Sequence, residues 1–215
     1  MKEFFQTVLT LLAVLGLFAL IVGVIVLLLM SRFATGAKPV IYLYPQETTE
    51  VTVNVELDGV FTSTYPDYSD GWTVTAQPDG TLTDAVGREY YCLFWEALLP
   101  ATEMNFDKGW CVRGEDTAAF LEEKLREIGL SDKEANEFII YWLPKMEHNA
   151  YNLISLQTEA YEDVAKLIVT PRPDSMLRVF MTWKSVARPV ELEPQTIVPF
   201  VREGFTVVEW GGMEK

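Results

Sequence analysis

The segment VTVNVEL at residues 51–57 alternates apolar and polar side chains more regularly than the rest of the chain. In an extended strand, Val51, Val53 and Val55 fall on one face and the polar residues between them fall on the other. This period of two predicts a β-strand with one buried face. Asp58-Gly59 follows directly and predicts a tight turn into a second strand, so that the two strands form a hairpin.

Other strand patterns surround a helical region in the middle of the chain. Strands are predicted at residues 40–44, 60–64, 71–76, 90–96, 164–170, 176–184 and 205–210. Between them, Leu121, Leu125 and Ile128 recur at the spacing of one helix face, and Gly129 supplies a helix stop. These residues predict a helix that packs on the sheet through its apolar face.

A second helix is predicted directly after the first. The residues Ser131-Asp132-Lys133-Glu134 match a capping box, in which the serine and the glutamate each bond the other's backbone N–H. Residues 138–143 either extend this helix or turn to strand, and Pro144 is expected to end the element in both cases, because proline cannot donate the next hydrogen bond. Strands, two helices and further strands predict the α+β class, with one mainly antiparallel β domain and two inserted helices.

The N-terminal segment differs from the rest of the chain. Residues 4–30 form a run of 27 positions without a charged side chain, which at about 1.5 Å per residue exceeds the roughly 30 Å of a bilayer core. The sequence therefore predicts an N-terminal transmembrane helix at residues 1–31 that contacts lipid through 4–30, a juxtamembrane linker at 32–38 and the α+β domain at 39–213. The alternatives are a signal peptide cleaved before Ala37 and a buried core helix, although a core helix normally shows a polar face and this segment has none.

A single membrane span has further consequences. The Lys and Arg residues near its two ends are almost balanced, so the positive-inside rule does not decide the orientation. Ala19 and Gly23 form a small-xxx-small pattern, which permits two such helices to pack closely. The expectation is a single-pass membrane protein with a weak homodimer contact through its anchor.

The chain is acidic, with a net charge of −14. Nearly all of the acidic residues lie in the predicted domain, which carries about −15. A surface of this charge repels the phosphates of nucleic acids and of anionic lipid headgroups. The charge therefore argues against nucleic acid as a partner, and solubility is the simplest interpretation of it.

Several short phrases occur along the predicted domain. They are KPVIYLYP at 38–45, LFWE at 93–96, GEDT at 114–117, YWLP at 141–144, YNLIS at 151–155 and VVEWGG at 207–212. In this order they resemble an uncharacterised family of bacterial proteins, often surface-associated or carrying an N-terminal signal or anchor. The resemblance spans residues 38–213 and implies a self-contained domain in an extracytoplasmic setting. It implies no activity and no site residues.

The two cysteines, Cys92 and Cys111, leave two interpretations open. Neither belongs to a C-x-x-C pair, so a zinc knuckle or a thioredoxin-like site is not predicted. In an exported domain they could form a disulfide that closes a loop of about 20 residues and contributes ~3 kcal/mol. They could equally be two buried free thiols.

Three residues are candidates for hydrolytic chemistry. Glu96 is a carboxylate next to an aromatic run, where an acid normally needs a partner or a task. It could be one of the two carboxylates, about 5–10 Å apart, that cleave glycosides. Cys111 and His148, the only histidine, are residue types of a cysteine hydrolase when an asparagine such as Asn149 or Asn152 accompanies them. His148 is equally explained as a surface-loop residue.

Aromatic and acidic residues near turns are candidates for ligand contacts. Trp72 and Trp110 follow glycines and are expected to be exposed, where a flat ring would meet a ligand. Trp95 and Trp183 fit strand patterns as core residues. The acidic segment 67–71 does not match the spacing of an EF-hand calcium loop. No metal and no cofactor is therefore predicted.

Two functions remain open from the sequence. The preferred hypothesis is a non-enzymatic, membrane-anchored envelope module that binds a protein or glycan partner, because no complete catalytic motif occurs. The alternative is a membrane-anchored hydrolase of cell-wall or other glycans that uses Glu96, with Cys111 and His148 as further candidates. A concave pocket with converging polar groups is the feature that would separate the two.

Overall fold

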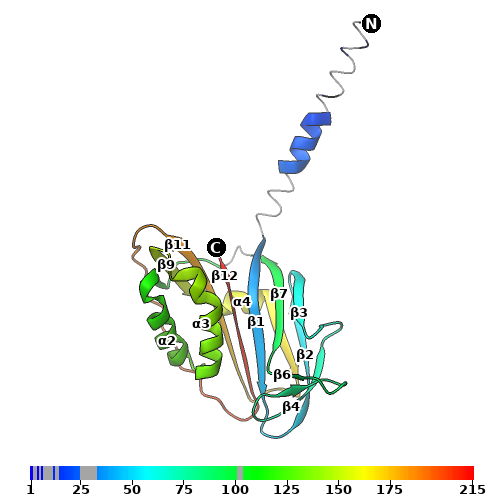
Figure 1. Ribbon diagram of the computed structural model, residues 1–215, viewed down its shortest axis with the longest axis vertical. Coiled ribbons are helices and arrows are strands. Elements are labelled where there is room, and N and C mark those ends of the chain that lie inside the picture. Colours follow the sequence, from blue (N-terminus) through cyan, green and yellow to red (C-terminus); the bar gives the residue numbers. More distant parts are fainter. Residues whose placement is uncertain (2–3, 5, 7–11, 13–14, 25–32, 101–103) are drawn as a thin grey trace. The chain divides into compact units, whose positions relative to one another are not determined.

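The computed structural model describes residues 1, 4, 6, 12, 15–24, 33–100 and 104–215. The chain divides into two units, Met1–Phe33 and Ala34–Lys215. In the first unit, residues 15–24 are helical. The second unit contains two β-sheets and three α-helices among its described residues (Figure 1).

A seven-stranded sheet forms the centre of the second unit. Across the sheet, its strands are β3 (Val60–Tyr65), β7 (Leu93–Pro100), β1 (Phe33–Tyr44), β12 (Thr206–Glu214), β11 (Ser175–Val186), β9 (Tyr151–Leu156) and β8 (Trp110–Arg113). β11 and β12 run parallel, whereas β3–β7, β1–β12, β9–β11 and β8–β9 are antiparallel pairs. Strands from the two ends of the chain therefore meet in the middle of this sheet.

A five-stranded sheet packs behind the first. Its strands, in spatial order, are β10 (Ala165–Thr170), β2 (Thr49–Leu57), β4 (Trp72–Ala76), β5 (Leu82–Thr83) and β6 (Glu89–Tyr90). Val51, Val53 and Val55 of β2 are buried while the residues between them are more exposed, so the predicted period of two is confirmed. These valines share one apolar core with Leu43 and Trp95 of the seven-stranded sheet.

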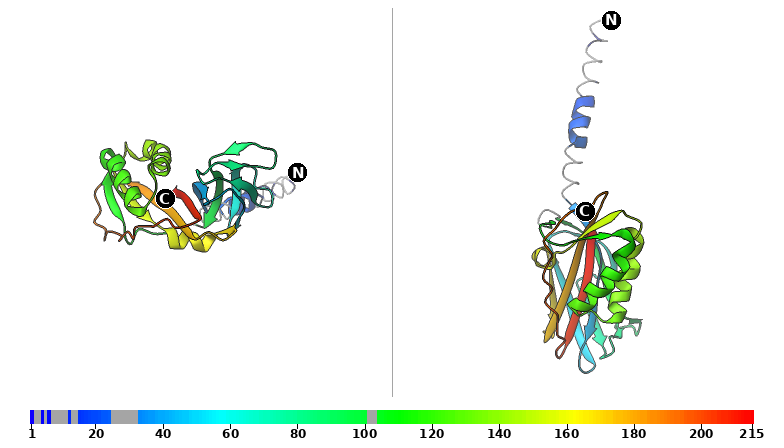
Figure 2. Two further views of the ribbon diagram at one scale, coloured as in Figure 1. Left: turned by 90° about the horizontal axis from the view of Figure 1, so that it is seen from below. Right: turned by 90° about the vertical axis from the view of Figure 1, so that its left-hand side faces the viewer.

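Helices pack on both faces of the seven-stranded sheet (Figure 2). On one face lie α2 (Thr117–Ile128), which follows a 3-10 turn at Gly114–Asp116, and α3 (Asp132–Met146). On the opposite face lies α4 (Thr158–Val164). α2 and α3 cover the β9–β11–β12 side of one face and leave the β7–β3 side of that face without a helix (Figure 1). This uncovered area is where a ligand could reach the sheet.

The predicted helix ends are largely confirmed. Gly129 ends α2 at φ 111°, and its N–H bonds the carbonyls of Arg126 and Leu125. Both bonds of the capping box between Ser131 and Glu134 are present at the start of α3. The prediction that Pro144 ends the second helix is wrong, because α3 continues through it to Met146. A proline in the last helical turn removes only one hydrogen bond, which exposed backbone can exchange for water.

A buried ion pair joins the two parallel strands. Arg178 of β11 and Glu209 of β12 lie opposite each other, with 2.7 Å between Nε and Oε2. Glu209 Oε1 also accepts hydrogen bonds from Trp95 Nε1 at 3.2 Å and from Tyr161 of α4 at 3.1 Å. Arg178 Nη1 donates to the Ala165 carbonyl at 2.7 Å. This network fixes α4 and β10 against the central strands.

A long connection, residues 187–205, runs from β11 to β12 and is here called the strap. The Phe200 N–H bonds the Ile128 carbonyl at 2.9 Å. The Arg202 guanidinium bonds the buried carboxylate of Glu134 and the Gly129 carbonyl. Burial alone would raise the pKa of Glu134, but the hydrogen bonds from Arg202 and from the Ser131 N–H hold this pKa below its ordinary value. The strap is therefore tied to the ends of α2 and α3.

The predicted transmembrane helix at residues 1–31 is not supported. Among the described residues, none of the helices has both the length and the apolar character needed to cross a bilayer. The described helical run at 15–24 would extend about 15 Å, roughly half of a hydrocarbon core, and the rest of the predicted lipid contact at 4–30 lies mostly outside the described residues. The single-pass membrane localisation, and the extracytoplasmic placement of the domain that depends on it, are corrected accordingly. The homodimer contact at Ala19 and Gly23 stays a prediction.

Several elements differ from the sequence prediction. β1 begins at Phe33, so most of the predicted linker at 32–38 is strand, and the second unit begins at Ala34. Strand β9 and helix α4 were not predicted. α4 has only seven residues, which is too short to show a clear helical period.

Candidate functional site

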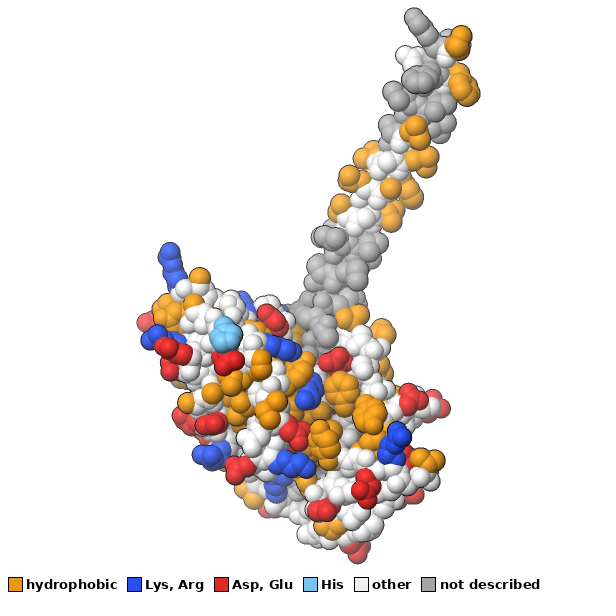
Figure 3. Space-filling view, viewed as in Figure 1, with side chains coloured by type: hydrophobic (Ala, Val, Ile, Leu, Met, Phe, Trp, Pro, Cys, Tyr) orange, Lys and Arg blue, Asp and Glu red, His pale blue; other side chains and the backbone are white. Residues whose placement is uncertain are grey.

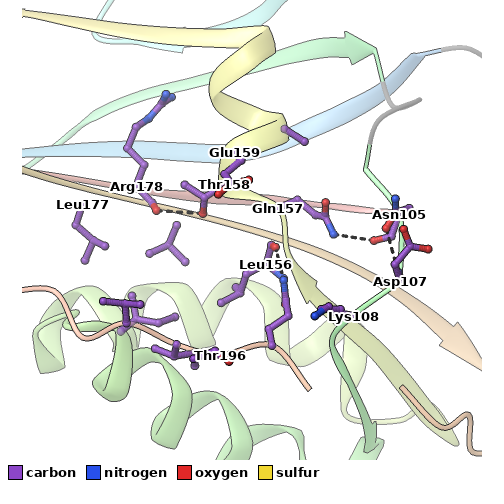
Figure 4. Close-up of a pocket in the computed structure, with 16 residues that line it drawn as sticks. Asn105, Asp107, Lys108, Leu156, Gln157, Thr158, Glu159, Leu177, Arg178 and Thr196 are labelled. Atoms are coloured by element: carbon purple, nitrogen blue, oxygen red, sulfur yellow. Dashed lines mark hydrogen bonds between the residues drawn. The ribbon is translucent and has the colours of Figure 1, made fainter. Parts of the chain in front are cut away.

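The first candidate site is a hollow of about 690 Å³ between α4, the edge of β11 and the strap (Figure 4). We call it the α4 pocket, and the lining residues used below are Lys108, Leu156, Gln157, Thr158, Glu159 and Gln195. Arg178 also lines the pocket, but its guanidinium points away from Leu177 and belongs to the ion pair with Glu209 (Figure 4). The buried charge pair is thus not a feature of this hollow.

Most of the amides and hydroxyls around the α4 pocket are bonded within the chain. The Gln195 side chain accepts from the Leu156 N–H at 2.7 Å and donates to the Leu156 carbonyl at 2.8 Å, as a neighbouring strand would. Gln157 Nε2 donates to the Asn105 carbonyl at 2.7 Å, and Thr158 Oγ1 donates to the Arg178 carbonyl at 3.2 Å (Figure 4). The Gln195 bonds fasten the strap to the end of β9. The Gln157 and Thr158 bonds hold the start of α4, so all of these bonds have structural tasks.

The second candidate site lies on the helix-covered face, where β1 and β7 are not covered by a helix. It is a hollow of about 510 Å³, here called the tyrosine cleft, and the lining residues used below are Lys38, Tyr65, Tyr90, Tyr91, Glu96 and Tyr141. Val40 of β1 and Phe94 of β7 also line it, α3 contributes one side, and β3 and β6 contribute the other. Hydrophobic side chains are exposed in the middle of this face of the protein (Figure 3).

The aromatic rings of the cleft are partly accessible. Tyr65 is 57% exposed and Tyr91 is 53% exposed. Tyr90 packs edge-on against Tyr65, with 5.6 Å between the ring centroids, and its hydroxyl donates to Asp84 at 2.9 Å. Exposed aromatic rings of this size in a concave surface are typical of ligand contacts.

Lys38 reaches the cleft because β1 is irregular at this point. The register of β1 against β12 shifts between Ala37 and Val40, and Lys38 has a positive φ of 51°. The two strands approach closely here, since a Cβ on Gly211 would lie 3.1 Å from the Cα atom of Pro39. A side chain at Gly211, in the VVEWGG phrase, would therefore crowd Pro39.

The Lys38 ammonium lies over aromatic rings. Its Nζ is 5.0 Å from the ring centroid of Tyr141 and 5.5 Å from that of Trp210, which are cation–π distances. No carboxylate of the described residues forms an ion pair with it. The Lys38 ammonium can therefore still donate hydrogen bonds to a ligand.

Glu96 carries the opposite charge in the same cleft. In β7, Trp95 and Leu99 face the core between the sheets, while Phe94 and Glu96 face the cleft. The Glu96 carboxylate is half-buried, and no residue that the structure describes gives it a hydrogen bond or an ion pair. The Glu96 oxygens are not among the buried unpaired atoms of the described residues, so they are open to water or to a ligand. A functional role for Glu96 stays a prediction, and the structure places this residue in the tyrosine cleft.

The thiol of Cys92 borders the cleft, in surroundings that disfavour its thiolate form. Burial, reinforced by the nearby Glu137 carboxylate, raises the pKa of Cys92 to about 12 and outweighs the opposite effect of Lys38. Cys92 and Cys111 are both free thiols, and they do not form the disulfide that was the other interpretation. A neutral Cys92 thiol leaves this side of the cleft floor without charge.

The structure does not bring Cys111 and His148 together. The sulfur of Cys111 in β8 accepts a hydrogen bond from the Val190 N–H of the strap at 3.4 Å. The side chain of His148 is 88% exposed, and its Nε2 lies 3.8 Å from Glu147. Asn152 bonds Thr117 and the Met146 carbonyl. The residues predicted for a cysteine hydrolase therefore contact different parts of the chain and do not form one site.

The predicted exposure of Trp72 is wrong. Trp72 is only 3% exposed, because its ring packs on Tyr68 and its Nε1 donates to the Pro66 carbonyl at 2.9 Å. Trp110 is half-buried and packs on Phe120, with 5.5 Å between the ring centroids. The accessible aromatic surface is provided by tyrosines instead.

No cluster of three metal-ligating side chains occurs among the residues that the structure describes. The acidic segment at 67–71 forms a turn, in which the Gly71 N–H bonds the Tyr68 carbonyl at 2.7 Å. The polar groups that line the tyrosine cleft include the carboxylates of Glu89 and Glu96 and the ammonium of Lys38.

Sequence reasoning missed Lys38, Tyr65, Tyr90, Tyr91 and Tyr141 as site residues. They come from β1, β3, β6, the β6–β7 connection and α3, and no local pattern brings such distant positions together. The adjacent pair Tyr90-Tyr91 before the LFWE phrase was the available signal, because two neighbouring tyrosines on a strand cannot both face one core.

Comparison with known proteins adds little. No protein-family model matches the sequence, and no solved structure matches it. An uncharacterized protein in the bglA 3' region of Butyrivibrio fibrisolvens is 45% identical over 62 residues, which cover 27% of this chain and 64% of that protein. The chain thus spans a little less than two thirds of the relative it matches, and the family resemblance stays a prediction. The relative is itself an uncharacterized protein, so the comparison suggests no function.

Proposed function

We propose that the protein is a glycan-binding module and that the tyrosine cleft is its binding site. The observation that supports this most strongly is the unpaired Glu96 carboxylate within a cleft of aromatic rings. The volume of about 510 Å³ falls within the range of roughly 300–1,000 Å³ that is usual for small-ligand sites.

The chemistry of the cleft matches the chemistry of a sugar. The apolar face of a pyranose ring packs on aromatic rings, as Tyr65 and Tyr91 offer them. Sugar hydroxyls would donate to the Glu96 carboxylate and accept from the Lys38 ammonium. One ring platform, one acceptor and one donor suffice to orient a neutral saccharide.

Charges of both signs lie in and around the cleft and together favour neutral sugars, because neither sign dominates. Glu89 and Glu96 line the cleft, and Glu137 lies next to Cys92 and Tyr42. These carboxylates would repel uronic acids and phosphorylated sugars. Among the described residues that line the cleft, Lys38 is the basic one, and the ammonium groups of Lys133 and Lys145 lie over the rings of Tyr91 and Tyr141.

A hydrolase that uses Glu96 is the alternative. Glu89 also lines the cleft, so a second carboxylate is available in principle. However, Glu89 is exposed and lies on the short edge strand β6, where nothing fixes its side chain opposite Glu96. Binding without cleavage is therefore the function that we favour.

The experiment is a glycan array followed by calorimetry with the full chain. Neutral saccharides should bind the wild type, and Tyr91→Ala should weaken binding about tenfold because it removes a stacking ring. Glu159→Gln, in the α4 pocket, is the control that removes a carboxylate elsewhere. A wild type that binds none of the arrayed saccharides would overturn the proposal, and release of shorter sugars would favour the hydrolase.

A further inference from the structure

Another cavity adjoins the tyrosine cleft. A second hollow of about 440 Å³ lies on the other side of Tyr65 and Tyr90, which line both cavities. We call it the Asp84 hollow, and the lining residues used here are Asp67, Thr73, Asp84, Val86 and Arg88. The two hollows are therefore separated by a single pair of rings.

That pair of rings is held in place. Tyr65 and Tyr90 pack edge-on at 75°, and the Tyr90 hydroxyl donates to Asp84 Oδ2 at 2.9 Å. The other oxygen of Asp84 accepts from the N–H groups of Val86 and Arg88, at 3.0 and 2.9 Å. These bonds order the 84–88 turn, so the ring pair forms a fixed ridge between the hollows.

Resting on the proposed glycan-binding function, we infer that the ligand is a linear oligosaccharide that lies across the Tyr65–Tyr90 ridge. One part of it occupies the tyrosine cleft and contacts Lys38 and Glu96. The following units occupy the Asp84 hollow, where Arg88 offers donors and Asp67 offers an acceptor. The site therefore recognises chain length as well as sugar type.

An extended peptide fits this surface less well. Peptides that bind sheets usually add a strand and bond the backbone of an edge. The floor of the tyrosine cleft is built from the faces of β1 and β7, which are interior strands of the seven-stranded sheet. The floor therefore offers side-chain rings and charges and not a row of backbone N–H groups. Of the two edge strands beside the cleft, β3 and β6, the second has only two residues.

The test is calorimetry of the full chain with glucose and N-acetylglucosamine oligomers, from the monosaccharide to the hexasaccharide. Affinity should rise by about tenfold or more once the oligomer is long enough to cross the ridge. Arg88→Ala should weaken the binding of the long oligomers more than that of the shortest ligand, because only the long oligomers reach the Asp84 hollow. The backbone N–H of Arg88, which bonds Asp84, is retained in this variant.

The outcomes separate this inference from the proposed function. Binding that depends on Glu96 but not on oligomer length would overturn the two-hollow inference alone. An equal effect of Arg88→Ala on short and long oligomers would also overturn it. If no oligomer binds, or if only peptides bind, both proposals fail.

Discussion

The α4 pocket is the larger hollow, yet most of its amides and hydroxyls are bonded to the chain, whereas the smaller tyrosine cleft contains a carboxylate without a partner. Gln195 at the first site completes a strand pairing with Leu156. Glu96 at the second completes nothing that the structure describes. The difference teaches that volume alone is a poor guide to function, and that unsatisfied polar groups are a better one.

The largest expected effect is on the stability of the strap. Arg202→Ala should lower the free energy of unfolding by about 2–3 kcal/mol, because it leaves the buried Glu134 carboxylate without its cation. This value is below the usual range for buried pairs, since Arg202 is about one-third exposed. Urea unfolding of the full chain measures it.

The control for this variant is Arg172→Ala, an exposed arginine for which no change is expected. Glycan binding by folded Arg202→Ala should equal that of the wild type, because the strap lies outside the tyrosine cleft. A loss of binding in the folded variant would mean that the strap and the cleft act together.

The next effect is on ligand binding. Glu96→Gln should weaken saccharide binding about 10- to 100-fold, which corresponds to the loss of ~1.5–3 kcal/mol from hydrogen bonds to a charged acceptor. Its stability should change by less than ~0.5 kcal/mol, because no bond within the described chain is lost. Calorimetry and urea unfolding of the same sample test both halves, and a strongly destabilised variant would contradict the description of Glu96 as unpaired.

Gln195→Ala should have the opposite profile. Removing the amide leaves the Leu156 N–H and carbonyl without partners, at a cost of about 1–2 kcal/mol of stability. Saccharide affinity should not change. Thr196→Ala, at the exposed neighbouring position, serves as the control. Weaker saccharide binding by Gln195→Ala would argue that the α4 pocket is the site.

The smallest effect concerns pH. The pKa of Cys92 is raised from 9.0 to about 12 in the folded protein, so its contribution to stability is present below pH 9 and is lost as the pH rises towards 12. Above pH 9, this thiol should lower the free energy of unfolding by about 1 kcal/mol for each pH unit. The measurement compares wild type with Cys92→Ala in urea at pH 8 and 10, and parallel curves would show that the thiol is not buried as described.

The parts of the fold with local signals could be predicted from the sequence. The alternation of β2, the glycine stop of α2 and the capping box of α3 each depend on neighbouring residues. The Pro144 prediction failed because the position of a proline within a helix matters more than its presence. The short helix α4 has no such signal and is fixed instead by contacts such as that of Tyr161 with Glu209.

The candidate site was only partly predictable. Glu96 stood out because an acid within an apolar run is unusual. The predicted aromatic contact Trp72 became core, since the Pro66 carbonyl satisfies its only polar atom. Tyr65 and Tyr141 lie far apart in the sequence, and only the packing of β3 and α3 around β7 brings them to one cleft.

Chemical-shift mapping by NMR, with the isotope-labelled full chain and a neutral oligosaccharide, tests the central claim most directly. We expect the amide signals of Lys38, Tyr91 and Glu96 to move on titration, while those of Gln157 and Gln195 stay in place. Movement at Gln157 and Gln195 with an unchanged tyrosine cleft would contradict the account, as would a spectrum that no saccharide alters.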